Sequence, residues 1–490
     1  MKRKKIKVLL VVLTFAFGCK DVEKEKQQDA YKTELVEYKT YQGKSFNGEL
    51  GYVNLKENRE DSLSKSIQVP FFRIKTTAKN PLPPIFVLAG GPGDNPSVLE
   101  EIKDIAPLLY EFSSRSDVVV LEQRGNGLSN PNLLCPSNYS LPLDEPLSFD
   151  LFAENYRSYI QNCSNYWQEK NRDLSGYNVI SMVYDIDDIR KTLGYNKIML
   201  FGGSFGSHHA LVYTKQYPYN VDRILLDSPE GLTHTVKLPV NADKILNQLS
   251  DLVSQDKNLN HQISSFKDLV KKQLTLLESN PIKVEVLHPE TNKQVDIVLG
   301  KYDLQLITAL ELGRKGYRAL PVHYLQMDQG NYTWLAKKAI NIRVNQQENL
   351  MAVLTDCASG ATKERRDLVN TQKFETILED ALNNVIFSAC DLIPNKELAN
   401  SLAEDFKSNI PILLIYGSQD ARTPPENAYD IAAYFNKPKM LKVEYGSHDL
   451  FKEVLDSIKP IMIDYLASEY PEGLIIPKEI NAKLDLKTEE

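Results

Sequence analysis

From residue 85 onward, short uninterrupted apolar runs alternate with longer stretches in which apolar residues recur at helical spacing. This alternation predicts a parallel sheet whose strands are connected by helices on both faces. Two earlier strand-like segments, residues 49–55 and 67–75, flank a charged turn and predict an antiparallel opening hairpin. Eight strands are therefore expected, and the six in the alternating part lie at residues 85–88, 118–121, 198–201, 224–226, 412–416 and 441–443.

Two long interruptions separate these runs. The larger, residues 231–408, is mostly helical, with apolar residues at helical spacing over 241–253 and 263–277 and a hairpin pattern over 282–298. An insertion of this size after the sixth strand predicts a cap domain above the functional site. The smaller interruption, residues 130–178, is expected to line the rim of the same pocket.

The first residues differ from the rest of the chain. Residues 1–7 are strongly basic, and residues 8–17 form an uncharged, mostly apolar run of ten. Ten residues are too few to cross a bilayer as a helix, so the pattern indicates a cleaved export signal. The signal ends at Gly18-Cys19, which resembles the lipobox of bacterial lipoproteins, where the cysteine receives the lipid.

We therefore expect a signal peptide over residues 1–18, a lipid-bearing Cys19 as the mature N-terminus, and a polar tether over 19–32. More than one acyl chain is needed for stable anchoring to a membrane. The protein is expected to be an exported, membrane-anchored bacterial lipoprotein of the periplasm or cell surface. An ordinary secretory signal with an incidental cysteine is the alternative.

A chain of 490 residues is too long for one compact core, which predicts two structural units. We expect a sheet-based core over residues 33–230 and 409–470, the cap over 231–408, and a tail over 471–490. The net charge of −7 at neutral pH and the composition give no sign of nucleic-acid binding.

Four cysteines remain after Cys19, an even number in an exported chain, where disulfides form. Pairing between sequence neighbours joins Cys135 to Cys163 and Cys357 to Cys390. This is the favoured one of three possible arrangements, and buried free thiols are the alternative.

The sequence Gly202-Gly203-Ser204-Phe205-Gly206 has the pattern G-x-S-x-G. It follows a predicted strand and precedes a predicted helix over residues 207–217, which is the setting of a nucleophile elbow. The flanking glycines avoid side-chain collisions where the strand passes into the helix. Ser204 is therefore the candidate nucleophile, and a glycine-rich turn without catalysis is the alternative.

A serine hydroxyl becomes nucleophilic when a base takes its proton. Of the seven histidines, only His448 lies on a loop directly after the last predicted strand, whereas His208 and His209 are expected to be structural. The carboxylate that orients the imidazole is expected to be Asp420, after the fifth apolar run, which gives the chain order Ser, Asp, His. Asp227, at the end of the preceding core strand, is the rival acid.

A tetrahedral intermediate carries an oxyanion, which needs preorganised backbone N–H donors. One donor is expected from Phe205 and the other from Gly91, in the glycine-rich loop Ala89-Gly90-Gly91-Pro92-Gly93. This loop lacks the Lys-Ser/Thr ending of a phosphate-binding loop. The chemistry expected of these groups needs neither a metal ion nor an organic cofactor.

Four ordered motifs together resemble those of the proline iminopeptidase and tripeptidyl aminopeptidase family. In chain order they occupy residues 90–93, 122–129, 202–206 and 417–424. Tyr317-Arg318-Ala319-Leu320-Pro321 and the paired cysteines are closer to the tripeptidyl branch. The resemblance covers about residues 49–466. It implies an α/β-hydrolase fold with a mostly parallel eight-stranded sheet and a large, mainly helical cap.

Two positions depart from the family pattern. Ala89 replaces the usual histidine before the glycine-rich loop, and Glu122 replaces the usual aspartate before Gln-Arg-Gly. Glu122 keeps the charge, so we expect Arg124 to retain a loop-anchoring partner there.

The resemblance implies acyl transfer to Ser204 and hydrolysis of a short peptide or amino-acid amide, held by its free N-terminus beneath the cap. A buried α-ammonium requires a carboxylate partner, for which Glu230 is the best-placed candidate. Asp356 and Asp391, beside the second cysteine pair, are further candidates, and ordinary solvated or helix-capping roles are the alternative for all three. A carboxylester hydrolase with the same triad and a non-catalytic surface binding lipoprotein are the alternative functions.

Overall fold

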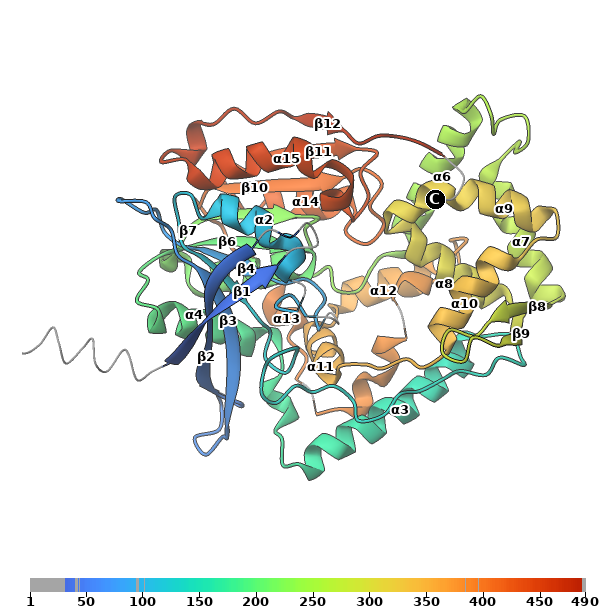
Figure 1. Cartoon of the computed structure of the whole chain (residues 1–490). Coiled ribbons are helices and arrows are strands. Elements are labelled where there is room, and N and C mark those ends of the chain that lie inside the picture. Colours follow the sequence, from blue (N-terminus) through green and yellow to red (C-terminus); the bar gives the residue numbers. More distant parts are fainter. Residues whose placement is uncertain are drawn as a thin grey trace, which may run out of the picture.

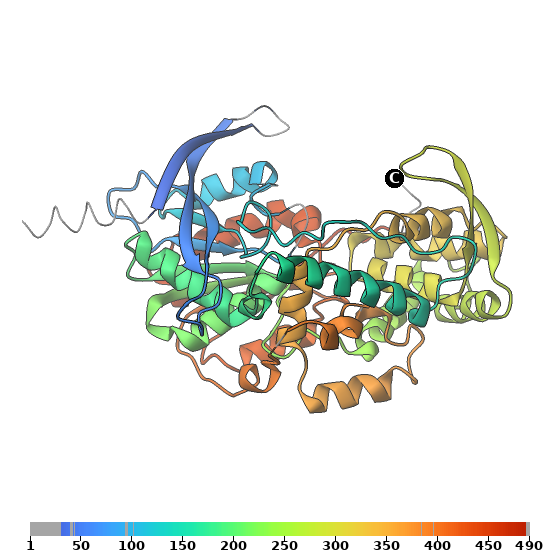
Figure 2. The ribbon, with the colours of Figure 1, turned by 90° about the horizontal axis from the view of Figure 1, so that it is seen from below.

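The computed structural model of the chain describes residues 31–39, 43, 45–93, 97–100, 102–383, 385–394 and 396–486 (Figure 1). The expected signal peptide, Cys19 and nearly all of the expected tether lie outside these described residues. Within the described part, none of the helices combines the length and apolar character that crossing a membrane requires. The chain forms a sheet-centred body with a helical body beside it (Figure 1, Figure 2).

The centre of the first body is a ten-stranded sheet. Its strands are β1 (Tyr31–Lys39), β2 (Ser45–Lys56), β3 (Ser66–Ile74), β4 (Ile85–Leu88), β5 (Val118–Leu121), β6 (Ile198–Gly203), β7 (Val221–Asp227), β10 (Ile412–Gly417), β11 (Lys439–Glu444) and β12 (Glu479–Asn481). They lie in the order β1-β2-β3-β5-β4-β6-β7-β10-β11-β12. Pairing is antiparallel from β1 to β5 and parallel from β5 to β12.

All eight strands that the sequence pattern predicts are present in this sheet. Two edge strands, β1 and β12, lie in segments without a predicted strand, so the expected eight-stranded sheet is corrected to ten strands. β1 is charged and largely exposed, and β12 has only three residues. Neither carries the apolar run by which an interior strand is recognised in a sequence.

Helices cover both faces of the sheet. They are α2 (Ile102–Phe112), α4 (Val179–Thr192), α5 (Phe205–Gln216), α14 (Pro425–Ala432) and α15 (Leu450–Ala467). Along β6, Leu200 packs into the apolar cluster of α4 and α5, whereas Met199 and Phe201 pack into the cluster of α2 and α15. Burial on both faces explains why the inner strands read as continuous apolar runs.

A second, mainly helical body is built from residues between β7 and β10 (Figure 1, Figure 2). Its elements are α6 (Pro239–Gln255), α7 (Phe266–Ser279), β8 (Ile282–Leu287), β9 (Gln294–Leu299), α8 (Lys301–Leu312), α9 (Leu320–Asp328) and α10 (Thr333–Arg343). These elements share an apolar core distinct from the two clusters at the sheet. The two helices and the hairpin predicted from the sequence correspond to α6, α7 and β8–β9.

The remainder of the insertion leads back to β10. Its helices are α11 (Leu350–Ser359), α12 (Lys363–Gln372) and α13 (Ala399–Leu402). Leu350 and Leu354 of α11 belong to the apolar cluster of α4 and α5. The insertion therefore contributes to the packing of both bodies.

Two disulfides join the outer segments. Cys135–Cys163 ties α3 (Phe149–Glu169) to the loop before it, and Cys357–Cys390 ties α11 to the 3-10 helix η5, with Cα–Cα distances of 5.3 and 5.4 Å. This is the pairing favoured from the sequence. The 3-10 helices are η1 (Leu174–Gly176), η2 (Pro218–Asn220), η3 (Lys315–Ala319), η4 (Ala381–Asn383), η5 (Ile386–Leu392) and η6 (Pro471–Gly473).

Candidate active site

The turn between β6 and α5 holds Ser204 in a strained backbone conformation, with φ of 51° and ψ of −125°. A Cβ atom on Gly206 would lie 2.2 Å from the Leu88 carbonyl oxygen. A Cβ atom on Gly202 would lie 2.3 Å from the Gly206 carbonyl oxygen. Both positions therefore require glycine, and the turn has the geometry of a nucleophile elbow.

Loops after β10 and β11 bring Asp420 and His448 together. His448 Nδ1 lies 2.8 Å from Asp420 Oδ2. When Nδ1–H donates to this carboxylate, Nε2 keeps the lone pair with which a general base accepts a proton. Because β6, β10 and β11 are parallel strands of one sheet, Ser204 stands at the same edge as these two loops.

The loop itself satisfies both oxygens of the fully buried Asp420 carboxylate. Oδ1 accepts hydrogen bonds from the backbone N–H groups of Arg422 and Thr423, at 2.8 and 2.9 Å. Oδ2 accepts one from Thr423 Oγ1 at 2.6 Å, beside that from His448. Burial alone would raise the pKa of Asp420, but the charge and hydrogen bond of His448 and the Thr423 hydrogen bonds bring the pKa below its usual value. Asp420 is therefore ionised at neutral pH.

The rival acid, Asp227, lies at the end of β7 beside the same turn. Its carbonyl oxygen accepts a hydrogen bond from Ser204 N at 3.1 Å. Its side chain is buried, and Oδ1 has no hydrogen-bond partner among the described residues. Burial raises the pKa of Asp227 to about 7, while His448 opposes this rise and Asp420 adds to it. A hydrogen bond to His448 therefore distinguishes Asp420 from its rival.

The glycine-rich loop after β4 touches the start of α5. Gln123 holds this loop, because its Nε2 donates to the carbonyl oxygens of Gly90 and Ala89 at 2.9 and 3.2 Å, and its Oε1 accepts from Gly93 N at 2.8 Å. Gly91, with φ of 98°, adopts a backbone conformation that favours glycine. The loop that carries the expected oxyanion donor is thus fixed by a side chain from the neighbouring strand end.

The expected pairing of Glu122 with Arg124 is wrong. Arg124 instead bonds Asp185 of α4 with two nitrogens, Nε at 2.7 Å and Nη2 at 2.6 Å, and its Nη1 donates to the Glu57 carbonyl oxygen at 2.6 Å. Glu122 points elsewhere: its Oε1 accepts from Gln123 N at 3.1 Å, and burial raises its pKa to about 7. The charge that neutralises the buried guanidinium is supplied by a helix 61 residues further along the chain.

The helical body holds the loop that carries His448. Gly313 O accepts a hydrogen bond from His448 N at 3.3 Å. The carbonyl oxygen of Tyr445, in the same loop, accepts from Tyr317 Oη at 3.0 Å and from Arg318 Nη2 at 2.8 Å. Tyr317 and Arg318 are the first two residues of the segment 317–321, in which the sequence resembles the tripeptidyl branch. In the structure they contact the loop of the candidate base.

A cavity of about 320 Å³ adjoins the glycine-rich loop. Its wall includes Gly91, two of the expected amine-binding residues, Glu230 and Asp356, and a third carboxylate that the sequence did not indicate, Glu348. Burial raises the pKa of Glu348. Among the described residues, no group of three or more His, Cys, Asp or Glu side chains is arranged to hold a metal ion. The cavity wall also contains Pro92, Gly93, Thr235, Lys237, Ala309, Leu310, Gln347, Asn349, Ala352, Leu382, Asn383, Ile386, Phe387 and Arg422.

The third expected amine-binding residue, Asp391, lines a different cavity, of about 620 Å³. Its side chain is 65% exposed and forms an ion pair with Arg157 at 2.5 Å. Asn383 and Phe387 line both cavities and stand between them. The structure therefore brings Glu230 and Asp356 together with Gly91 and leaves Asp391 apart.

Residues 83–453 match the family model described as alpha/beta hydrolase fold. The Escherichia coli (strain K12) protein named "Putative hydrolase YuaR" is 20% identical over 388 residues, which are 75% of this chain and 74% of that protein. The Mycoplasma genitalium protein named "Putative proline iminopeptidase" is 28% identical over 143 residues, which are only 29% of this chain and 32% of that protein.

Solved structures give a more distant likeness. Rv0554 from Mycobacterium tuberculosis aligns with a TM-score of 0.39 and 14% identity, covering 85% of this chain and 98% of that one. A score this low adds no weight, so family membership rests on the match over residues 83–453.

Proposed function

The chain belongs to the alpha/beta hydrolase fold family, and we propose that within it this protein is a serine aminopeptidase that releases short N-terminal peptides or amino acids. The observation that carries the proposal is the 2.8 Å contact between His448 Nδ1 and Asp420 Oδ2, at the sheet edge that also bears the strained Ser204. Their chain order, Ser then Asp then His, is the order of the triad in this fold and supports the roles proposed for them.

In the proposed reaction, His448 Nε2 takes the proton of Ser204 Oγ as this oxygen attacks the substrate carbonyl carbon. The backbone N–H groups of Gly91 and Phe205 stabilise the negative charge that develops on the carbonyl oxygen. Collapse of the intermediate breaks the C–N bond, and the leaving amine takes the proton from His448. Water, deprotonated by His448, then attacks the acyl-enzyme, which releases the acid and restores Ser204.

Specificity for a free N-terminus is supported by the charge of the cavity wall. Glu230 and Asp356 line the same cavity as Gly91, the expected oxyanion donor, so a substrate whose carbonyl oxygen accepts from Gly91 would have carboxylates within its pocket. An α-ammonium is charged at neutral pH, and its burial is favourable only with such a partner. A cavity of about 320 Å³ also favours short peptides over folded proteins.

The test compares a tripeptide amide with its N-acetylated form, which keeps the scissile bond and removes the charge. Acetylation is expected to lower kcat/KM at least about tenfold, a loss of about 1.4 kcal/mol of transition-state binding. Equal rates on both substrates would reject the aminopeptidase and favour a carboxylester hydrolase, which aryl and alkyl esters would then reveal. A protein that no serine-reactive phosphonate labels would be a binding protein instead.

We also propose that the protein is exported and anchored to a membrane through a lipid on Cys19. The basic and apolar segments before this cysteine support the proposal. Mass spectrometry of detergent-extracted protein should find an acylated Cys19 at the mature N-terminus. A soluble product that begins at another residue would contradict it.

A further inference from the structure

Within the cavity wall, Glu230 already has one cationic partner. Lys237 Nζ lies 2.6 Å from Glu230 Oε2 and donates to the His234 carbonyl oxygen at 3.0 Å. The Glu230 side chain is 6% exposed and that of Lys237 18%. The other oxygen of Glu230, Oε1, is buried and has no hydrogen-bond partner among the described residues. One oxygen of this carboxylate is thus satisfied by Lys237, and the other is left for a donor that the described residues do not supply.

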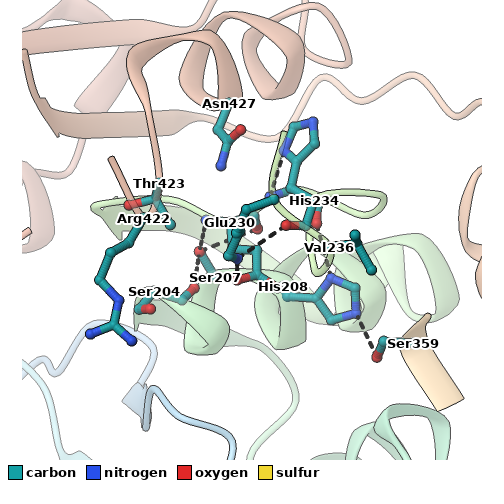
Figure 3. A network of polar contacts seen from close by, with 12 residues as sticks. Ser204, Ser207, His208, Glu230, His234, Val236, Ser359, Arg422, Thr423 and Asn427 are labelled. Carbon is teal, nitrogen blue, oxygen red and sulfur yellow. Dashed lines mark hydrogen bonds and ion pairs between the residues drawn. The ribbon is translucent and has the colours of Figure 1, made fainter. Parts of the chain in front are cut away.

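The backbone fixes Glu230 relative to the nucleophile. Ser207, in the first turn of α5, accepts a hydrogen bond from Glu230 N at 2.7 Å and donates to the Ser204 carbonyl oxygen. Figure 3 shows Ser207 between Ser204 and Glu230. A shift of Glu230 would therefore disturb the turn that carries Ser204.

The backbone of Lys237 is held by Asn383, which lines the same cavity. Asn383 Oδ1 accepts from Lys237 N, and Asn383 Nδ2 donates to Lys237 O at 2.8 Å. These two hydrogen bonds with one amide side chain hold the lysine backbone, and Nζ itself is held by Glu230 Oε2 and the His234 carbonyl oxygen.

Lys237 also favours the ionised form of Glu230, because it lowers the pKa of this carboxyl group. Burial alone would raise the pKa of Glu230, and the positive charge of Lys237 is the largest influence that opposes it, so the pKa lies below its usual value. His208 and His234 face the same carboxylate, but burial lowers the pKa of each, which leaves both neutral at pH 7. Arg365 of α12 also interacts electrostatically with Glu230. Glu230 therefore depends mainly on Lys237 for its negative charge.

We propose that Lys237 is the positioning residue of an ammonium site: its Nζ occupies Oε2 of Glu230 and leaves Oε1 to bind the charged α-amine of the substrate. This inference rests on the aminopeptidase function proposed above and assigns its amine specificity to a lysine–glutamate pair. The ligand class is a primary ammonium group, because Oε1 needs a charged N–H donor that fits a buried site. An N-acylated substrate offers an uncharged amide there and binds less well.

The test measures kcat/KM for the tripeptide amide and for its N-acetylated form at pH 7, in the full chain and in Lys237→Met. The wild type is expected to prefer the free amine at least about tenfold, and Lys237→Met is expected to reduce this ratio about tenfold through KM rather than kcat. Lys237→Arg should restore the ratio. Lys244→Met, which removes a lysine paired with Glu426 on the exposed surface, is the matched control and should keep it.

The outcomes separate the two proposals. A wild-type ratio near one would reject the aminopeptidase itself. A wild-type preference that Lys237→Met leaves unchanged would overturn the role of Lys237 alone, and so would parallel losses on both substrates, which indicate a purely structural effect. Should Lys237→Met fail to fold, Lys237→Gln retains an N–H donor for Oε2 without the charge and must lower the same ratio.

Discussion

The loop of Asp420 and the wall that holds Glu230 both present a buried carboxylate to the same region, but they satisfy it differently. Both oxygens of Asp420 accept hydrogen bonds from its own loop and from His448. Glu230 has one oxygen on Lys237 and a second without a partner among the described residues. The chain itself therefore supplies hydrogen-bond donors to both oxygens of Asp420. For the second oxygen of Glu230 we propose that the donor is a ligand.

The two carboxylates therefore suit different roles: Asp420 suits a role in the reaction, and Glu230 suits a role in substrate recognition. The sheet edge preorganises a charge relative to an imidazole, so little reorganisation is needed during a reaction. The cavity wall instead keeps an unsatisfied polar atom, which is costly unless a ligand completes it. We therefore assign reactivity to the loops that carry Ser204, Asp420 and His448, and substrate choice to the cavity wall around Glu230 and Lys237.

The largest expected effect comes from the sheet edge. Ser204→Ala and His448→Ala should each lower kcat by about 10⁶-fold, because nucleophile and base act as one unit. Turnover of a tripeptide amide under enzyme excess measures the residual rate. Ser254→Ala, on the exposed end of α6, controls for serine removal and should retain full activity. Wild-type turnover by either of the first two variants would break the assignment of the triad.

The next effect distinguishes the two carboxylates near His448. Asp420→Asn should lower kcat by about 10⁴-fold, because the amide no longer favours the tautomer that leaves Nε2 free. Asp227→Asn should keep kcat within about tenfold, because Asp420 is the one of these two carboxylates that bonds His448 Nδ1. Steady-state rates of both variants decide the matter. The reverse order would make Asp227 the acid.

Much of this sheet edge is predictable from the sequence. The apolar runs and the opening-hairpin pattern predict eight of the ten strands, and the order of Ser204, Asp420 and His448 follows from loops directly after three of them. Local patterns suffice there because a parallel sheet places the carboxyl ends of its strands together.

The contacts between distant segments were not predictable in the same way. The motif around Arg124 shows Glu122 as its near neighbour, but the true partner, Asp185, lies on α4 and is set by how that helix packs. Asp391 follows Cys390 in the chain, yet its side chain does not line the cavity of Glu230 and instead forms an ion pair with Arg157. Sequence proximity gives the position of a residue along the backbone and does not give the side to which its side chain points.

A smaller effect concerns stability and pH. In the folded chain the pKa of Asp227 is about 7, against an ordinary value of 3.8. Between these values the unfolded chain loses its proton while the folded chain keeps it, so this group's contribution to stability is full below about pH 4 and is lost as the pH rises to about 7. The total is a few kcal/mol, since one pKa unit corresponds to about 1.4 kcal/mol.

Asp227→Asn mimics the protonated acid at every pH. It should therefore flatten the dependence of the unfolding free energy on pH between about 4 and 7, as measured by urea denaturation. Asp251→Asn, on the exposed surface of α6, should leave that dependence as it is. An unchanged slope in Asp227→Asn would mean that Asp227 is ionised in the folded protein.

The smallest effect tests whether the helical body supports reactivity as well as specificity. Tyr317→Phe removes the hydroxyl that donates to the Tyr445 carbonyl oxygen in the loop of His448, while Arg318 still donates to the same oxygen. A loss of about 1 kcal/mol, or about fivefold in kcat, is expected because one of two donors remains. The matched control is Tyr324→Phe, since Tyr324 is equally buried in the same apolar core but its hydroxyl bonds Thr308. Both variants should lower the melting temperature, and only Tyr317→Phe should lower kcat. Equal kcat in the two variants would mean that the helical body affects substrate choice and does not affect the reactivity of the loops after β10 and β11.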